Sequence, residues 1–286
     1  MNLATATENN FSVIILAAGL GKRMQNPEIP KVLATVNKKP LIFYVLQTAI
    51  SLNPEKICLI VGHKKEQVID YVANKFFNDC DDNSKKFLLE NIVFAVQEQQ
   101  LGTGHAVQCA EHFFSKNNDC ENINSNEKSQ NEILILSGDV PLLSEKTLSD
   151  FIQFHKKECA DISVLSAEAV APFGYGRIVR NSNNEFVEIV EEKDATVEIK
   201  KVCEINSGIY FLKSDLLFDL LNKINNQNSQ NEFYLTDIIK IGKSQNKKVI
   251  ASKIATIDEI QGINTVDQLR TVEEIMNSMI KNSKKN

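Results

Sequence analysis

Small and basic residues follow the first apolar run of the chain in a pattern that suits phosphate binding. Residues 16–24 read LAAGLGKRM and lie at the end of the apolar segment Ser12–Ala18. Glycine and alanine let a backbone approach a ligand closely and turn its N–H groups toward anionic oxygens. A dinucleotide-binding loop requires glycine where Met24 stands, and a Walker loop requires Ser or Thr where Arg23 stands. We therefore expect a phosphate-binding turn of another kind, with a strand-to-helix turn that binds nothing as the alternative.

The stretch that follows this turn is rich in basic residues. Between positions 22 and 39 five bases face one acid, Glu28, so the local charge is 5 − 1 = +4 on a chain whose formal charge is −5. Such a patch would attract a polyphosphate. Lys31 follows Pro30, whose ring restricts the backbone, and this predicts an ammonium group held on a defined loop. A solvated basic surface is the alternative for the lysines at the end of the stretch.

An aspartate follows the fourth apolar run of the chain. Asp139 comes after Ile133–Leu136, at the carboxyl end of an expected strand, which is the edge where open α/β sheets bind their ligands. Mg²⁺ prefers oxygen ligands and often takes only one or two of them from the protein. The position therefore predicts a Mg²⁺ ligand, with a turn aspartate before Pro141 as the alternative.

Strand-like and helix-like segments alternate around these residues in the first half of the chain. The strand-like runs are Ser12–Ala18, Lys56–Gly62, Ile92–Gln97 and Ile133–Leu136. Helical patterns cover Pro40–Leu52, Lys64–Phe77 and the residues after Gly102. Alternation of this kind predicts βαβ units in a Rossmann-like, doubly wound and mostly parallel α/β sheet.

The second half of the chain has a different pattern. We expect a β-rich substrate half added to the same sheet, with strands at Ile162–Ala169, Arg177–Arg180, Phe186–Glu191 and Glu204–Leu212. Two polar stretches, Asn78–Asn91 and Ser115–Glu132, lack apolar periodicity and are expected to be surface loops without chemistry. Apolar residues recur at helical spacing from Val266 to Ile280, which predicts an amphipathic C-terminal helix.

The composition argues against several classes of protein. The chain has 32 basic and 37 acidic residues, which disfavours a broad nucleic-acid-binding face. Its six cysteines form no Cys-x-x-Cys pair, so neither a zinc site nor a disulfide framework is indicated. The first ten residues lack the basic and apolar regions of a secretion signal, and nowhere do about 18 apolar residues run together. We expect a cytoplasmic protein that binds neither nucleic acid nor a membrane.

Several sequence blocks together resemble the sugar-nucleotide pyrophosphorylase family. The first is LAAGLGKRM followed by PKVL. The others are Gln97 with QQLGTGHA at 99–106, SGDVPL at 137–142, FGYGRI at 173–178, IVEEKDAT at 189–196, EINSGIY at 204–210 and NEFYLTDII at 231–239. They occur in the family's order and resemble the uridyltransferase domain of the bacterial GlmU type from Phe11 to Leu269. We expect a disordered N-terminus over residues 1–11, a nucleotidyltransferase domain over 12–263, and a C-terminal amphipathic helix with a basic tail over 264–286.

The resemblance also implies roles for individual residues. The phosphate loop would consist of Leu16, Ala17, Ala18 and Gly19, and the catalytic cations would be Arg23 and Lys31. The uracil would be bound by Gln97, Gly102 and Thr103, and the N-acetylhexosamine by Gly174, Glu191 and Asn206. Mg²⁺ would be bound by Asp139 and Asn264. A glutamine amide can offer both a donor and an acceptor to the imide edge of uracil. The asparagine lies in the block GINTVDQL, where it also suits the N-cap of the C-terminal helix.

Three positions within these blocks need separate comment. Ser137 stands where the family commonly has tyrosine, and Asn231 stands where glycine is usual. Neither change removes a charge, so we expect altered ribose or sugar contacts. His105 lies at an expected helix start and has no nucleophile partner pattern, so a structural role is expected for it.

The activity that the resemblance implies is the joining of UTP and N-acetylglucosamine 1-phosphate, with Mg²⁺ as cofactor, to give UDP-N-acetylglucosamine and pyrophosphate for cell wall synthesis. The alternatives are another sugar-1-phosphate nucleotidyltransferase and a catalytically silent regulatory subunit that binds a nucleotide sugar. In the GlmU type a helical arm leads to a β-helix with acetyltransferase activity. The sequence shows no six-residue repeat and ends at Asn286, so we expect no acetyltransferase activity; the oligomeric state stays open.

Overall fold

The structure is a computed structural model that describes residues 10–21, 24, 28–114 and 131–283. Its centre is a parallel sheet with the strand order β6-β1-β4-β5. These strands are β1 (Phe11–Ala17), β4 (Ile57–Val61), β5 (Ile92–Val96) and β6 (Glu132–Ser137). The runs FSVIILA and ICLIV are almost wholly buried, as expected for parallel strands that are covered on both faces.

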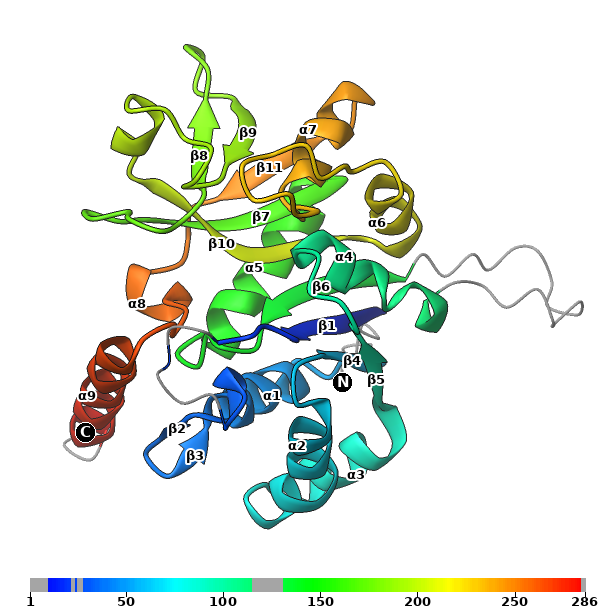
Figure 1. The fold of residues 1–286 in the computed structure, drawn as a ribbon, viewed down its shortest axis with the longest axis vertical. Coiled ribbons are helices and arrows are strands. Elements are labelled where there is room, and N and C mark those ends of the chain that lie inside the picture. Colours follow the sequence, from blue (N-terminus) through cyan, green and yellow to red (C-terminus); the bar gives the residue numbers. More distant parts are fainter. Residues whose placement is uncertain (1–9, 22–23, 25–27, 115–130, 284–286) are drawn as a thin grey trace, which may run out of the picture.

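The sheet continues beyond β6 through an antiparallel strand. β10 (Glu204–Lys213) lies between β6 and β7 (Ile162–Glu168) and runs antiparallel to both. β11 (Val249–Ser252) pairs in parallel with β7 at the edge. A hairpin of β8 (Arg177–Arg180) and β9 (Phe186–Val190) leaves the sheet at β10, at the end of the molecule away from β4 and β5 (Figure 1). The expected α/β class and the added β-rich half are thus confirmed.

Helices cover both faces of the sheet. One face carries α1 (Leu41–Ser51), α2 (Lys65–Asp70) and α5 (Glu145–Glu158), which pack with Val13 and Ile15 of β1. The other face carries α4 (Thr103–Gln108), α6 (Ser214–Leu221) and α7 (Asp237–Ser244), which pack with Ile14. The remaining elements are β2 (Thr35–Val36), β3 (Lys39–Pro40), α3 (Asp82–Asn91), α8 (Ile257–Ile260) and α9 (Val266–Ser283), with single turns at Lys31–Leu33, Tyr71–Lys75, Phe76–Asn78, Glu111–Phe113 and Ile199–Lys201.

The prediction of a loop over Asn78–Asn91 is wrong. This stretch contains the helix α3, which begins after Asp81, whose side chain accepts a hydrogen bond of 2.9 Å from the Ser84 N–H. Only Ser84 and Leu88 of the helix are buried, so no apolar stripe marks it in the sequence. Of the second stretch expected to be a loop, residues 115–130 lie outside the described part of the chain, and Glu132 begins β6.

The C-terminal helix α9 packs on the same chain, beside β2 (Figure 1). Val272 and Met276 are buried with Ile263 and Val36 in a small apolar cluster. The sequence suggested Asn264 as the N-cap of this helix, and this expectation is wrong. Gln268 and Thr265 form a reciprocal capping box, in which the Gln268 N–H donates to Thr265 Oγ1 at 3.2 Å and the Thr265 N–H donates to Gln268 Oε1 at 3.1 Å.

Among the described residues, no helix combines the length and the apolar character needed to span a bilayer.

Replacement of Met276 tests whether this helix is part of the fold. Met276 is 8% exposed and Met279, one turn later, is 52% exposed. We expect Met276→Ala to lower the free energy of unfolding by about 2 kcal/mol or more, because it leaves a cavity. The control Met279→Ala should change it by less than about 0.5 kcal/mol. Urea unfolding measures both, and equal effects would contradict the packing described here.

Candidate active site

Two adjoining cavities lie at the carboxyl ends of β1 and β6. Their volumes are about 490 and 230 Å³. Both are lined by Leu16, Thr103, Ser137, Asp139 and Asn264. Two ligands bound side by side would therefore meet at these residues, at the sheet edge where open α/β folds bind ligands.

The turn after β1 forms one wall of the larger cavity. Leu16, Ala17, Ala18 and Gly19 line it, together with Leu20 and Gly21. The N–H groups of residues 19–21 donate no backbone hydrogen bond to any described residue, as is typical of a turn that binds an anion. Gly21 has a φ of 60°, and a Cβ there would lie 2.9 Å from Lys31 Cβ. Glycine at this position therefore lets the loop that carries Lys31 approach the turn.

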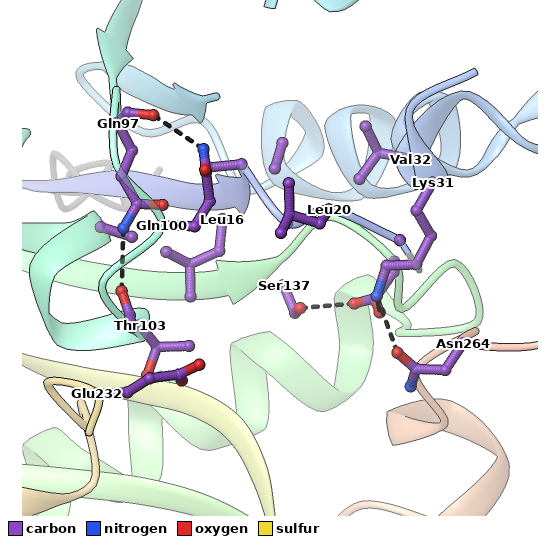
Figure 2. A pocket seen from close by; sticks show the side chains of 17 residues that line it. Leu16, Leu20, Lys31, Val32, Gln97, Gln100, Thr103, Ser137, Glu232 and Asn264 are labelled. Carbon is purple, nitrogen blue, oxygen red and sulfur yellow. Dashed lines mark hydrogen bonds and ion pairs between the residues drawn. The ribbon is translucent and has the colours of Figure 1, made fainter. Parts of the chain in front are cut away.

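Lys31 and Asn264 lie side by side in the larger cavity (Figure 2). Asp139, which lines both cavities, pairs with Lys31. The Lys31 ammonium forms an ion pair with Asp139 Oδ2 and donates a hydrogen bond of 3.1 Å to Asn264 Oδ1. Ser137 Oγ donates to the other oxygen, Asp139 Oδ1, at 2.6 Å. Burial alone would raise the pKa of the Asp139 carboxyl, but the charge and hydrogen bond of Lys31 and the Ser137 hydroxyl hold it below its usual range. Asp139 is therefore a carboxylate at neutral pH.

The basic stretch does not gather as a whole at the site. Lys39 forms an ion pair of 2.6 Å with Asp79 and lies over the Phe43 ring. Of the bases in this stretch that the structure describes, only Lys31 lines the larger cavity. Arg23, the second expected catalytic cation, lies outside the described residues.

Gln97 and Gly102 also line the larger cavity, next to Thr103, which lines both cavities. Gly102 has a φ of 116°, and a Cβ there would lie 2.5 Å from the Phe233 carbonyl oxygen, so only glycine fits. The expectation that the Gln97 amide offers both a donor and an acceptor is wrong in one respect. Its Nε2 is bonded to the Gly102 carbonyl oxygen and lies 3.1 Å from His105 Nδ1, which leaves only the oxygen Oε1 for a ligand.

The smaller cavity contains Gly174, Glu191 and Asn206, the residues expected to contact a sugar. The Asn206 amide is held on both sides, because its Nδ2 donates to the Tyr210 hydroxyl at 2.9 Å and its Oδ1 accepts from the Gly208 N–H at 3.0 Å. Thr236 Oγ1 donates to Glu191 Oε1 at 3.2 Å. Burial raises the pKa of the Glu191 carboxyl, and the Thr236 hydroxyl offsets only part of this effect.

Sequence reasoning missed several residues of this site. Tyr175, Tyr210 and Thr236 line the smaller cavity and Gln100 lines the larger one. All four lie inside blocks that carried the family resemblance, but nothing in their spacing shows which side chains face a ligand.

The two departures from the family pattern have simple structural explanations. Ser137 orients the Asp139 carboxylate through its hydroxyl. Asn231 has a φ of 55°, a left-handed conformation that glycine adopts freely and that asparagine tolerates better than most residues.

Comparisons with known proteins give a consistent result. A family model described as nucleotidyl transferase matches residues 12–256. A curated relative from Streptococcus agalactiae, the bifunctional protein GlmU, is 38% identical over 267 residues, which make up 93% of this chain and 52% of the relative. The protein of the same name from Thermosipho melanesiensis is 39% identical over 264 residues, 92% of this chain and 50% of the relative. The chain thus spans about half the length of these curated relatives.

Solved structures share the fold. A UDP-glucose pyrophosphorylase complexed with UDP-glucose matches with a TM-score of 0.71, covering 94% of this chain and 99% of that chain. The sequence identity is 20%, so the likeness concerns the fold alone.

Glu191 and its neighbour Glu192 provide a test of the electrostatics of the site. Burial would raise the pKa of Glu192 too, but hydrogen bonds from Arg177 and from the Gly174 N–H, with the charges of Arg177 and Lys200, hold that pKa below its usual range. Arg177 is only 2% exposed and lies 2.7 Å from Glu192. The two adjacent carboxylates therefore have opposite effects on stability.

We expect Glu191→Gln to stabilise the protein at pH 7 and Glu192→Gln to destabilise it. The pKa of Glu191 is raised in the folded state, so its contribution to stability is present below the unfolded pKa and is lost as pH rises through the folded pKa. The pKa of Glu192 is lowered, so its contribution is present above the unfolded pKa and is lost as pH falls through the folded pKa. Melting temperatures at pH 7 should rise for the first variant and fall by about 3 °C or more for the second. Changes of the same sign would contradict this electrostatic description.

Proposed function

This chain belongs to the nucleotidyl transferase family, and we propose that it joins UTP and N-acetylglucosamine 1-phosphate to give UDP-N-acetylglucosamine and pyrophosphate. The observation that carries the proposal is the junction of the two cavities. A cation, a carboxylate and an amide oxygen converge there from distant parts of the chain. The junction offers a polyphosphate and a sugar phosphate one common reaction site.

The reaction is an in-line attack by a phosphate oxygen of the sugar 1-phosphate on the α-phosphorus of UTP. A bond forms between this oxygen and the α-phosphorus as the bond to the leaving pyrophosphate breaks. The attacking phosphate is already an anion, so neither a general base nor a covalent enzyme intermediate is required. The tasks of the protein are positioning and charge neutralisation, by Lys31, by Arg23 and by the N–H groups of residues 19–21.

A divalent cation, which we take to be Mg²⁺, fits the oxygen atoms at the junction. Asp139 and Asn264 present a carboxylate and an amide oxygen to the same Lys31 nitrogen, so the two oxygens lie close to one point. Both are hard ligands of the kind that Mg²⁺ accepts, and substrate phosphates and water commonly complete its octahedron. When bound, the ion neutralises charge on the phosphates.

The smaller cavity suits the sugar. A carboxylate accepts hydrogen bonds from sugar hydroxyls, and Glu191 faces this cavity with a hydroxyl partner, Thr236, that leaves most of its acceptor capacity free. The fixed amide of Asn206 and the backbone of Gly174 add polar groups of defined orientation.

A substrate panel tests the proposal. Four nucleoside triphosphates are combined with N-acetylglucosamine 1-phosphate, glucose 1-phosphate and galactose 1-phosphate, and pyrophosphate release is followed in the presence of Mg²⁺. We expect the highest kcat/KM for UTP with N-acetylglucosamine 1-phosphate. A higher value for another pair would identify a different transferase, and no release with any pair would favour a silent nucleotide-sugar-binding protein.

Replacement of Lys31 tests the charge-neutralising role. Lys31→Ala should lower kcat by about 10² or more, because it removes a cation from charge that develops in the transition state. Lys39→Ala is the matched control, since that lysine pairs with Asp79 and does not line the cavities. The kcat of both variants is measured by steady-state kinetics. A near-normal kcat in Lys31→Ala would contradict the mechanism.

A further inference from the structure

Three consecutive residues, Gly174, Tyr175 and Gly176, line the smaller cavity. This lining segment, residues 174–176, lies in the connection between β7 and β8 and ends where β8 begins, so its backbone is outside the strands. Backbone N–H and carbonyl groups outside regular structure need other partners, each of which must be found individually. The position of the lining segment therefore depends on the few groups that bond to it.

Two charged side chains hold the first part of the lining segment. The Arg177 guanidinium donates to the Tyr175 carbonyl oxygen and, at 2.7 Å, to Glu192 Oε2. The Gly174 N–H donates to the same carboxylate oxygen at 3.3 Å. A guanidinium can only donate and a carbonyl oxygen can only accept, so the direction of these bonds is fixed. Neither Arg177 nor Glu192 is among the described residues that line the two cavities.

The last residue of the lining segment lies close to the carboxylate that faces the cavity. The Gly176 carbonyl oxygen accepts from the Asn206 N–H at 2.9 Å. A Cβ at Gly176 would lie 3.5 Å from both carboxylate oxygens of Glu191. A shift of the lining segment would therefore change the space beside Glu191, where the sugar is proposed to bind.

The burial of Arg177 is costly. Its side chain is 2% exposed, and its Nε has no hydrogen-bond partner in the described part of the chain. Buried ion pairs often add little stability, and apolar side chains of similar volume can fill the same space at least as well. An apolar pair could not bond the Tyr175 carbonyl or accept from the Gly174 N–H. The position of the lining segment is thus what the charged pair provides.

We propose that Arg177 and Glu192 are positioning residues for the sugar 1-phosphate, because they fix the backbone of the lining segment and with it the space that the sugar enters. The inference rests on the proposed binding of a sugar 1-phosphate in the smaller cavity. It concerns this substrate and not UTP, since residues 174–176 line the smaller cavity and not the larger one.

The first test compares two arginines of the same strand. Arg177→Met keeps a long side chain and removes the donors, so we expect the KM for N-acetylglucosamine 1-phosphate to rise about threefold to tenfold, the effect of one hydrogen bond. The KM for UTP should stay close to that of the unsubstituted protein. Arg180→Met is the matched control. Arg180 donates to Glu204 at 2.8 and 2.7 Å and to the Asn184 carbonyl oxygen, outside the lining segment, so both KM values should stay unchanged.

A double variant, Arg177→Met with Glu192→Met, separates positioning from stability. Since no unpaired charge remains, the double variant should recover much of the melting temperature that Arg177→Met loses. The raised KM for the sugar 1-phosphate should persist, because neither the Tyr175 carbonyl nor the Gly174 N–H regains its partner. A KM that returns to normal as the melting temperature recovers would show a purely structural role and contradict the inference.

Three further results would overturn the inference. They are an unchanged KM for the sugar 1-phosphate in a folded Arg177→Met variant, an equal rise of both KM values in that variant, and the same rise in Arg180→Met. If Arg177→Met does not fold, Glu192→Ala decides, because Glu192 is more exposed. A raised KM for the sugar 1-phosphate alone supports the inference, and an unchanged one contradicts it. Failure of the proposed function is distinguishable, because the unsubstituted protein would then prefer another substrate pair or release no pyrophosphate.

Discussion

The ion pair between Lys31 and Asp139 ties together the parts of the chain that form the site. Lys31 comes from the loop after β1, Asp139 follows the neighbouring strand β6, and Asn264 precedes α9. Removing two charges from water is costly unless further hydrogen bonds compensate them. Ser137 and Asn264 supply such bonds to the pair. Because β1 and β6 are neighbours in the sheet, the segments that follow them place Lys31 beside Asp139.

Around this point the two cavities differ in how their polar groups are stabilised. In the larger one, backbone N–H groups and a fixed amide oxygen are left without partners among the described residues. In the smaller one, Glu191 is partly buried and has no basic partner in the described part of the chain, and burial raises its pKa. Groups of this kind reduce stability, and they are found where a ligand supplies the missing partner. Among the described residues, the site thus contains polar groups without a hydrogen-bonding or charge partner.

Much of the fold could be predicted from the sequence, whereas the details of the site could not. The strands β1, β4, β5 and β6 were predicted because each is a short apolar run; β1, β4 and β6 are largely buried, whereas β5 is buried only at Ala95. The helix α3 was missed because it has no apolar stripe. Lys31 lies 108 residues from Asp139 and 233 from Asn264, and spacing gives no information on such contacts. The orientation of the Gln97 amide depends on contacts with the Gly102 carbonyl and the His105 ring, which the order of residues in a motif does not show, so the sequence predicted one donor too many.

The most direct test of the proposed chemistry is to follow oxygen atoms through the reaction. N-acetylglucosamine 1-phosphate labelled with ¹⁸O in its non-bridging phosphate oxygens is mixed with UTP, Mg²⁺ and the protein, and the products are examined by ³¹P NMR. Attack by the sugar phosphate on the α-phosphorus predicts UDP-N-acetylglucosamine with ¹⁸O in the bridge between its two phosphorus atoms, and pyrophosphate without label. Label in the pyrophosphate, or the absence of the labelled product, would contradict the account.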